Sequence, residues 1–260
     1  MEIKDVSFTY PNGRTILNNI NLKIGKENII GIIGPNGSGK TTLLDIMANL
    51  IVPTNGEVNN KENIGYLFQN TKSSFFCKTV KEEIEMSVIT HNYKVNQIDK
   101  RIKDVLKIVN LSEDVLEKKS LELSNKEAKL VALATILIYN PKIILLDEPT
   151  TNLDDETKEE LIKLFKLLKN KYHKTIIIVS HDMELIHKLV DNIIVLNNGE
   201  IVLYGNKYQV FNNTRVLKKY GILAPKIMIF REKVLNKKGI RLEYRDEIND
   251  LIKDIFRNVY

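Results

Sequence analysis

Residues 28–50 read NIIGIIGPNGSGKTTLLDIMANL, in which an apolar run, a glycine-rich loop and a second apolar segment follow one another directly. The first run is continuously apolar, which is typical of a strand buried on both faces. The loop GPNGSGKT, residues 34–41, fits the pattern G-x-x-x-x-G-K-[ST]. Residues 42–50 are compatible with a helix, so this stretch predicts the strand–loop–helix unit that a phosphate-binding loop requires, and a chance glycine-rich turn would lack that context.

The chemistry of this loop points to a nucleoside triphosphate with Mg²⁺. Glycines allow successive backbone N–H groups to curl around a phosphate, and the N-terminus of the following helix attracts negative charge. Lys40 is predicted to reach the β- and γ-phosphates, and the hydroxyl of Thr41 to ligate Mg²⁺. The nucleotide-binding residues predicted here are Tyr10, Asn36, Gly37, Ser38, Gly39, Lys40, Thr41 and Thr42.

An acidic pair follows a second apolar run. Residues 143–146 are Ile-Ile-Leu-Leu, and Asp147 and Glu148 come directly after them. Ligands of parallel sheets bind at the carboxyl ends of strands, so Asp147 is predicted to hold Mg²⁺ and Glu148 to act as general base toward the attacking water. Acidic residues often end strands, and only the combination with the phosphate loop makes this pair informative.

Three further polar or aromatic residues complete the predicted site. His181 comes after the apolar run 176–179 and is interpreted as a catalytic contact to the γ-phosphate rather than a surface histidine. Gln69 follows the strand-like residues 64–68 and is predicted to carry its amide to the metal and the water. Tyr10 precedes a turn and offers a stacking surface for adenine, although ordinary packing explains an aromatic residue equally well.

The order of these patterns predicts an α/β fold with a parallel sheet. Buried strand-like runs alternate with helical segments, as in other proteins of this class. Residues 193–196 and 201–203 flank Asn197-Asn198-Gly199-Glu200, which predicts a hairpin. Strand-like runs are absent between 79 and 137, where Ile98, Ile102, Val105, Leu106 and Val109 recur at helical spacing. Apolar residues of the tail, from Ile248 to Val259, predict an amphipathic helix that packs on its own chain, and Pro225 an earlier helix to about residue 236.

Composition limits the class of protein. The chain has 260 residues, one cysteine and a net charge of +6, and no run approaches the roughly 20 apolar residues that cross a bilayer. The first residues do not form a secretory signal. The positive charge is interpreted as a lysine-rich surface, with no nucleic-acid partner, because lysines alternate with acidic residues along the chain. Any membrane role is expected to depend on a partner.

Taken in order, these motifs resemble those of an ABC-type ATPase. Tyr10, the loop 34–41, Gln69, Leu123-Ser124, residues 146–150, Asn152-Leu153-Asp154 and Ser180-His181-Asp182 are similar, respectively, to the adenine-stacking aromatic, Walker A, Q-loop, signature, Walker B, D-loop and switch histidine of that family. The resemblance implies a P-loop fold of ABC type with an N-terminal antiparallel part. It also implies an ABC nucleotide-binding domain over 1–212, a helical insert at about 75–137, and a C-terminal helical extension over 213–260.

A narrower resemblance is to the ATPases of energy-coupling-factor importers. It rests on the segment from Phe68 to Ile84 and on the tail, including Val210-Phe211 and Leu223-Ala224-Pro225. It implies a peripheral protein on the cytoplasmic face of the cell membrane, where two ATPases lie under a transmembrane coupling protein. A separate membrane component then binds the cargo, a vitamin or a transition-metal ion. The insert would receive the coupling protein, and the extension would help hold the ATPase dimer.

One motif departs from the family pattern. Where the signature is usually Leu-Ser-Gly-Gly-Gln, this chain has Leu123-Ser124-Asn125-Lys126-Glu127. In the family this motif acts on the ATP of the partner subunit, through Ser124, Asn125, Lys126 and Glu127 here. Side chains in place of glycines crowd that contact, and Glu127 brings a negative charge that Lys126 could offset. We therefore expect a heterodimer with one intact and one weakened site. The alternatives are another ABC transporter ATPase and a nucleotide-binding regulatory subunit.

Overall fold

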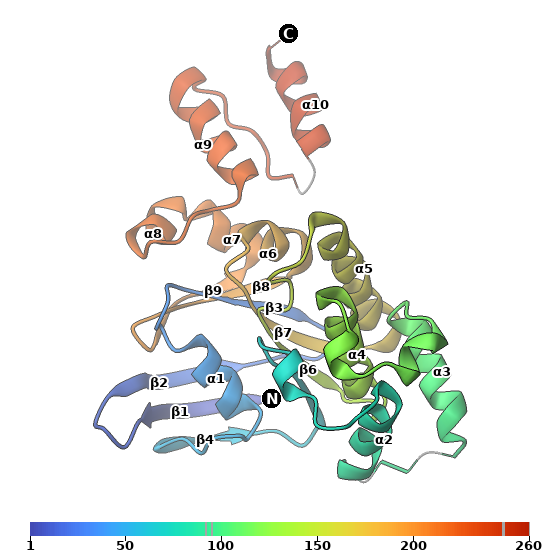
Figure 1. Cartoon of the computed structure of the whole chain (residues 1–260). Helices are drawn as coiled ribbons and strands as arrows, with labels where there is room; N and C mark the ends of the chain where they lie inside the picture. Colours follow the sequence, from blue (N-terminus) through green and yellow to red (C-terminus); the bar gives the residue numbers. More distant parts are fainter. Residues whose placement is uncertain (92, 95, 246–247, 260) are drawn as a thin grey trace.

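The computed structural model describes residues 1–91, 93–94, 96–245 and 248–259 of the chain. Two sheets form its centre, and a group of helices flanks the larger sheet at the edge formed by β5 (Figure 1). The last helices, α9 and α10, extend away from the sheets. The predicted α/β fold, with an antiparallel N-terminal part and a parallel core, is confirmed.

The N-terminal sheet contains three antiparallel strands in the order β2-β1-β4. These are β1 (Glu2–Thr9), β2 (Thr15–Lys23) and β4 (Asn55–Asn59). Ile20 and Leu22 of β2, and Ile24 just after it, are buried as their alternation with polar residues predicts. This sheet ends beside the phosphate loop and brings Tyr10 to it.

The larger sheet has the strand order β5-β6-β7-β3-β8-β9. Its strands are β3 (Ile29–Ile33), β5 (Ile64–Leu67), β6 (Ile143–Asp147), β7 (Thr175–Val179), β8 (Asn192–Asn197) and β9 (Glu200–Asn206). All neighbours are parallel except β8 and β9, which form the predicted hairpin. Asn198 and Gly199 have φ values of 47° and 77° in its turn, which explains the choice of residues there.

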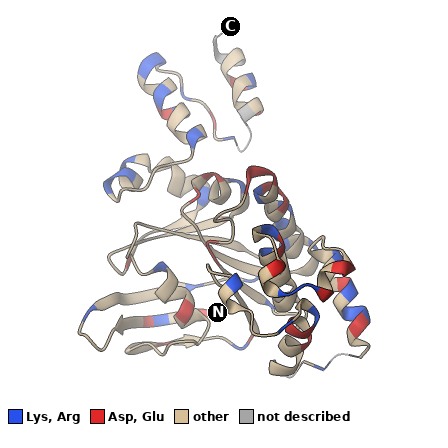
Figure 2. Ribbon diagram, in the orientation of Figure 1, with Lys and Arg blue, Asp and Glu red and all other residues tan. Residues whose placement is uncertain are grey.

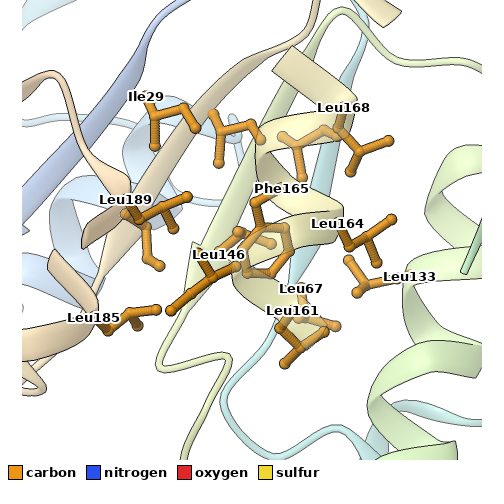
Figure 3. Close-up of a cluster of buried hydrophobic side chains, with 14 of the residues drawn as sticks. Ile29, Leu67, Leu133, Leu146, Leu161, Leu164, Phe165, Leu168, Leu185 and Leu189 are labelled. Carbon is orange, nitrogen blue, oxygen red and sulfur yellow. The ribbon is translucent and has the colours of Figure 1, made fainter. Parts of the chain in front are cut away.

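Helices cover both faces of this sheet. They include α1 (Lys40–Met47), α5 (Asp155–Tyr172) and α6 (Met183–Leu189). Phe165 of α5 is fully buried and lies among leucines from several elements, Leu146 of β6 among them (Figure 3). Helix α1 begins at Lys40 and ends at Met47, three residues before the predicted end, because Asn49 adopts a positive φ of 58°.

The region predicted as an insert is helical. It contains α2 (Val80–Thr90), α3 (Ile98–Ile108), α4 (Asn125–Leu137) and the short 3₁₀ turns η2 (Glu113–Glu117) and η3 (Ser120–Glu122), and the turn η1 (Lys72–Ser74) comes just before it. Helix α4 packs closely on strand β5, where a side chain on Gly65 would come within 2.2 Å of Ile136. The insert is therefore in direct contact with the strand that leads to Gln69.

The C-terminal part contains α7 (Lys207–Asn212), α8 (Thr214–Lys219), α9 (Lys226–Lys238) and α10 (Ile248–Val259). The proposed domain boundary, 212/213, falls at the end of α7. The apolar stripe of α10 is only partly covered: Leu251 is buried, but Ile252 and Phe256 are 43% and 62% exposed. Packing on its own chain thus accounts for part of the stripe.

Charged residues of both signs are interspersed along the helices of the described chain (Figure 2). Exposed lysines and carboxylates of the insert form ion pairs, for example Lys103 with Glu113 at 2.9 Å. Among the described helices, none combines the length and the apolar character that a membrane span needs.

Candidate functional site

The phosphate loop connects the buried end of β3 to the first turn of α1. A side chain at Gly34 would lie 2.1 Å from the carbonyl oxygen of Leu196, so only glycine fits there. Gly39 is the N-cap of α1 with a φ of 101°, a conformation that other residues rarely adopt. The loop therefore turns tightly and directs backbone N–H groups toward the space in front of the helix.

Lys40 is buried at the bottom of this loop. Its ammonium donates hydrogen bonds to the carbonyl oxygens of Gly34 and Pro35 at 3.0 and 2.9 Å. Burial lowers the pKa of Lys40, while the nearby Glu148 and Asp147 carboxylates oppose that shift. The loop thus holds a desolvated positive charge, which suits a polyphosphate.

Thr41 and Asp147 come together from different elements. The hydroxyl of Thr41 donates a hydrogen bond of 2.9 Å to Oδ2 of Asp147, at the end of β6. Asp147 is 3% exposed, and burial raises the pKa of its carboxyl. Two oxygen ligands side by side, one of them acidic, match the preference of Mg²⁺.

Glu148 is held in an unusual backbone conformation beside His181. Its φ is 46°, in the left-handed region, and such strain is concentrated at functional sites. Its Oε2 accepts a hydrogen bond of 3.3 Å from the hydroxyl of Ser180, and its Oε1 lies 3.6 Å from Nε2 of His181. Burial, and secondarily Asp147, raises the pKa of Glu148, whereas burial and Lys40 lower the pKa of His181. A carboxyl and an imidazole whose charged forms are both disfavoured by burial therefore face the same space.

A cavity of about 430 Å³ connects these groups. It is lined by nearly all the residues predicted to bind nucleotide or metal or to act in catalysis, namely Tyr10, Asn36, Gly37, Gly39, Lys40, Thr41, Thr42, Gln69, Asp147, Glu148 and His181. Ser38 lies beneath this lining, 2% exposed. Tyr10 is 42% exposed and packs edge-to-face on Phe8, which leaves part of its ring accessible from the cavity.

Three residues line the cavity without having been predicted: Arg14, Ile16 and Val179. Arg14 lies in the turn after Tyr10, and its only signal in the sequence is a basic residue close to an exposed aromatic one. Ile16 and Val179 belong to strands, and an apolar residue in a strand carries no sign that it borders a cavity.

One buried atom of the lining supports the interpretation that the cavity takes a polar ligand. Within the part of the chain that the structure describes, Glu148 Oε1 is buried and has no hydrogen-bond partner. Buried polar atoms without partners are rare in native proteins and call for a ligand, a water or an ion. With Lys40 for phosphate and with Thr41 and Asp147 for the metal, the residues present fit Mg-ATP.

The signature residues lie outside this cavity, at the N-terminus of α4. Ser124 is the N-cap, and it forms a reciprocal capping box with Glu127. The sequence suggested that Lys126 offsets the charge of Glu127. In the structure Lys126 instead forms an ion pair of 2.6 Å with Glu160 of α5. The charge of Glu127 is balanced by the ammonium of Lys118, which lies 2.7 Å from its carboxylate. The hydrogen bond from Lys118 and that from the backbone of Ser124 lower the pKa of Glu127 to about 2.

The sequence of the chain is similar to those of known proteins. A sequence profile described as ABC transporter matches residues 17–151. The ATP-binding protein EcfA2 of an energy-coupling factor transporter from Acetivibrio thermocellus is 35% identical over 256 residues, which cover 91% of each chain. The corresponding protein EcfA of Methanocaldococcus jannaschii is 33% identical, over 98% of this chain and 96% of that protein.

Solved structures agree with this similarity. CbiO1 of Clostridium perfringens, described as part of the ABC transporter complex CbiONQ, has a TM-score of 0.73 and 29% identity, over 89% of this chain and 98% of that one. A dimeric ATP-binding cassette in a post-hydrolysis state with ADP and Pi has a TM-score of 0.71 and 31% identity, over 79% and 97%.

Proposed function

The chain belongs to the ABC transporter family of ATP-hydrolysing proteins, and from this premise we propose that it powers an energy-coupling-factor-type importer of a vitamin or a transition-metal ion. The observation that carries this proposal is the extent of the likeness. Similarity to the ATP-binding proteins of such transporters spans 91–98% of the chain and is not restricted to the ATP-binding motifs that all ABC proteins share.

Each residue of the cavity that the sequence predicted has a place in the proposed reaction. Lys40 binds the β- and γ-phosphates, and backbone N–H groups of residues 36–42 surround them. Tyr10 stacks on adenine. Thr41 and Asp147 would hold Mg²⁺ together with Gln69, and the bound metal would neutralise charge on the phosphates.

Glu148 and His181 act in the hydrolytic step. Glu148 accepts a proton from the attacking water, whose oxygen forms a bond to the γ-phosphorus while the bond from phosphorus to the ADP oxygen breaks. The raised pKa of Glu148 makes this carboxylate a better proton acceptor. His181 donates a hydrogen bond to the γ-phosphate oxygens as charge shifts between them. The proton leaves with the product phosphate, so atoms and charge balance.

A groove beside the insert supports attachment to a membrane partner. It has a volume of about 310 Å³ and lies between β5, α2 and α4, with Leu50, Phe68, Ser87, His91 and Tyr139 in its lining. Met86 and Ile89 of α2 are 50% and 68% exposed, and Phe76 is 90% exposed. Exposed apolar side chains, here partly on the helix that also contributes Ser87 to the groove, are typical of protein interfaces. We propose that a helix of the transmembrane coupling protein docks here, with the chain peripheral on the cytoplasmic face of the membrane.

The altered signature supports a heterodimer. In a homodimer, each ATP would face Asn125, Lys126 and Glu127 of the other copy, whereas a second ATPase with glycines at these positions would complete the intact site of this chain. We therefore propose that the second ATPase subunit is a different protein, and that a separate membrane component binds the cargo.

Purification of the tagged chain from detergent-solubilised membranes of its source cells tests this proposal. Mass spectrometry should identify a second ABC ATPase and a membrane-spanning protein. Met86→Glu with Ile89→Glu should release the chain from membranes without changing its affinity for ATP, while Lys100→Glu, an exposed charge change on α3, should not. Recovery with soluble proteins alone would refute the transporter assignment.

A nucleotide-binding regulatory subunit is the second candidate, because Ser124 and Glu127 are engaged with each other in the capping box. The intact Glu148 and His181 oppose it. Measurement of ATP turnover by the purified complex separates the two candidates. If the chain is a regulatory subunit, it binds ATP but does not hydrolyse it, and Glu148→Gln leaves the turnover of the complex unchanged.

A further inference from the structure

A buried lysine of the insert contacts the nucleotide site and has no place in the roles assigned above. Lys129 belongs to α4 and is 6% exposed. Its ammonium donates a hydrogen bond of 2.9 Å to the backbone carbonyl oxygen of Gln69. Burying an ammonium is unfavourable unless it is hydrogen-bonded or paired, so this arrangement needs an explanation.

The surroundings of Lys129 are acidic. Gln69 comes two residues after β5, Asp147 ends β6, and these strands are neighbours in which Leu67 is paired with Leu146. The ammonium consequently lies where both strands end. Burial lowers the pKa of Lys129 to about 8, and attraction to Asp147 and Glu148 opposes that shift. The charge of Lys129 in turn favours the ionised form of Asp147.

A second buried lysine shows what a purely structural role looks like. Lys174 is 3% exposed, and burial lowers its pKa to about 8 as well. Its ammonium donates to Asn140 Oδ1 and to the carbonyl oxygen of Pro141, both at 2.6 Å. It precedes β7, at the end of the sheet opposite the acidic pair, and the charges that affect it are the cations Lys142 and Arg101. Burial therefore does not distinguish the two lysines, but the groups that they face do.

We propose that Lys129 is a positioning residue of the ATPase site, which fixes the backbone at Gln69 next to the strand end that carries the acidic pair. Lys129 is five positions from Ser124 on the same helix. It ties the end of α4 that is offered to the partner's ATP to the site where this chain binds its own ATP. The inference rests on the proposed function for the meaning of that site.

The effect of removing Lys129 follows from this geometry. Without the ammonium, the carbonyl of Gln69 loses its hydrogen bond to α4. The backbone that carries the Gln69 side chain is then no longer held in place. A misplacement of about 1 Å at a catalytic site can lower the rate about 100-fold. Lys40 and the loop amides are untouched, so ATP binding should be retained.

The test compares Lys129→Met, Lys129→Arg and the control Lys174→Met in the full chain. Thermal unfolding identifies folded variants, equilibrium binding of a fluorescent ATP analogue measures affinity, and single-turnover hydrolysis measures the chemical step. We expect Lys129→Met to lower the rate about 10- to 100-fold with affinity within about 3-fold of wild type. Lys129→Arg, which keeps a charge and a donor, should restore most of the rate, and Lys174→Met should lose stability but not rate.

Hydrogen exchange of the peptide covering 68–72 provides a readout that does not need turnover. Lys129→Met should speed its exchange, and Lys174→Met should not. Equal effects of the two substitutions on both rate and exchange would overturn the inference, as would an unchanged rate and exchange in Lys129→Met. If Lys129→Met is unfolded, Lys129→Gln takes its place under the same criteria. Failure of the wild-type chain and its complex to hydrolyse ATP would refute the proposed function instead, and the exchange comparison would still decide the anchoring role.

Discussion

Glu127→Ala tests whether the altered signature is held by its own chain. The carboxylate accepts a hydrogen bond of 2.8 Å from the backbone N–H of Ser124 and one of 2.7 Å from the ammonium of Lys118. The pKa of Glu127 falls from 4.5 to about 2 in the folded chain. That difference corresponds to at most about 3.4 kcal/mol of stability.

Solvent reduces this figure. The Glu127 side chain is 27% exposed, and ion pairs at the surface contribute little, so the expected loss on Glu127→Ala is about 1–2 kcal/mol, in line with the loss of a helix cap. For a chain of this size the melting temperature should fall by about 2–8 °C. Glu127→Gln, which can still cap α4 but carries no charge, should lose less.

The pH dependence separates the charge from simple packing. Because the folded pKa lies below the unfolded one, the stabilisation is complete above pH 4.5 and is lost as the pH falls toward 2. From these two values, roughly 40% of the electrostatic part should remain at pH 3.

Thermal unfolding of the wild type and both variants at pH 7, 4.5 and 3 measures this, with the exposed Glu117→Ala as the matched control. A Glu127→Ala variant that melts within about 1 °C of wild type at pH 7 would refute the capping role. A difference that persists unchanged at pH 3 would refute the electrostatic part.

Three other variants test the site. Lys40→Ala should weaken ATP binding about 10- to 100-fold, because it removes the charged donor to the phosphates, and unchanged affinity in equilibrium binding would contradict the loop assignment. Glu148→Gln should keep ATP binding but lower turnover about 10²- to 10⁴-fold in a phosphate-release assay. Because burial raises the pKa of Glu148 above 4.5 in the folded chain, its contribution to stability falls as the pH rises from 4.5 through the folded pKa, so Glu148→Gln should flatten that fall in melting temperature. Asn125→Gly and Lys126→Gly with Glu127→Gln should raise turnover at the partner's site in the reconstituted complex, and no change there would mean that the present signature is adequate.

Much of the site could be predicted because its residues follow strands in order. Continuous apolar runs identified β3, β6 and β7, and the carboxyl ends of parallel strands necessarily meet at one edge of the sheet. The loop, the acidic pair and His181 were therefore brought together in the predicted way. The hairpin after β8 was equally readable, because Asn198 and Gly199 favour its turn.

Other features depend on which side chain meets which across the fold. No spacing rule distinguishes the buried Lys129 from the exposed lysines near it. The ion pairs of Glu127 with Lys118 and of Lys126 with Glu160 join residues up to 34 positions apart, so the sequence suggested a wrong partner. The periodicity of α10 predicted a helix correctly but could not say that Ile252 and Phe256 would stay exposed.

The hydrogen bonds of the phosphate loop have a consequence for the burial of its positive charge. Lys40 is bonded to Gly34 and Pro35, and Thr41 to Asp147. Binding of a phosphate therefore requires Lys40 to give up its hydrogen bonds to these carbonyl oxygens, while backbone N–H groups of the loop gain an acceptor. When the phosphates leave, the ammonium of Lys40 can return to the carbonyl oxygens of Gly34 and Pro35. It is therefore not left buried without a hydrogen-bond partner. Because the ammonium of Lys40 has hydrogen-bond partners both with and without a phosphate, the cost of burying this charge is limited in both states.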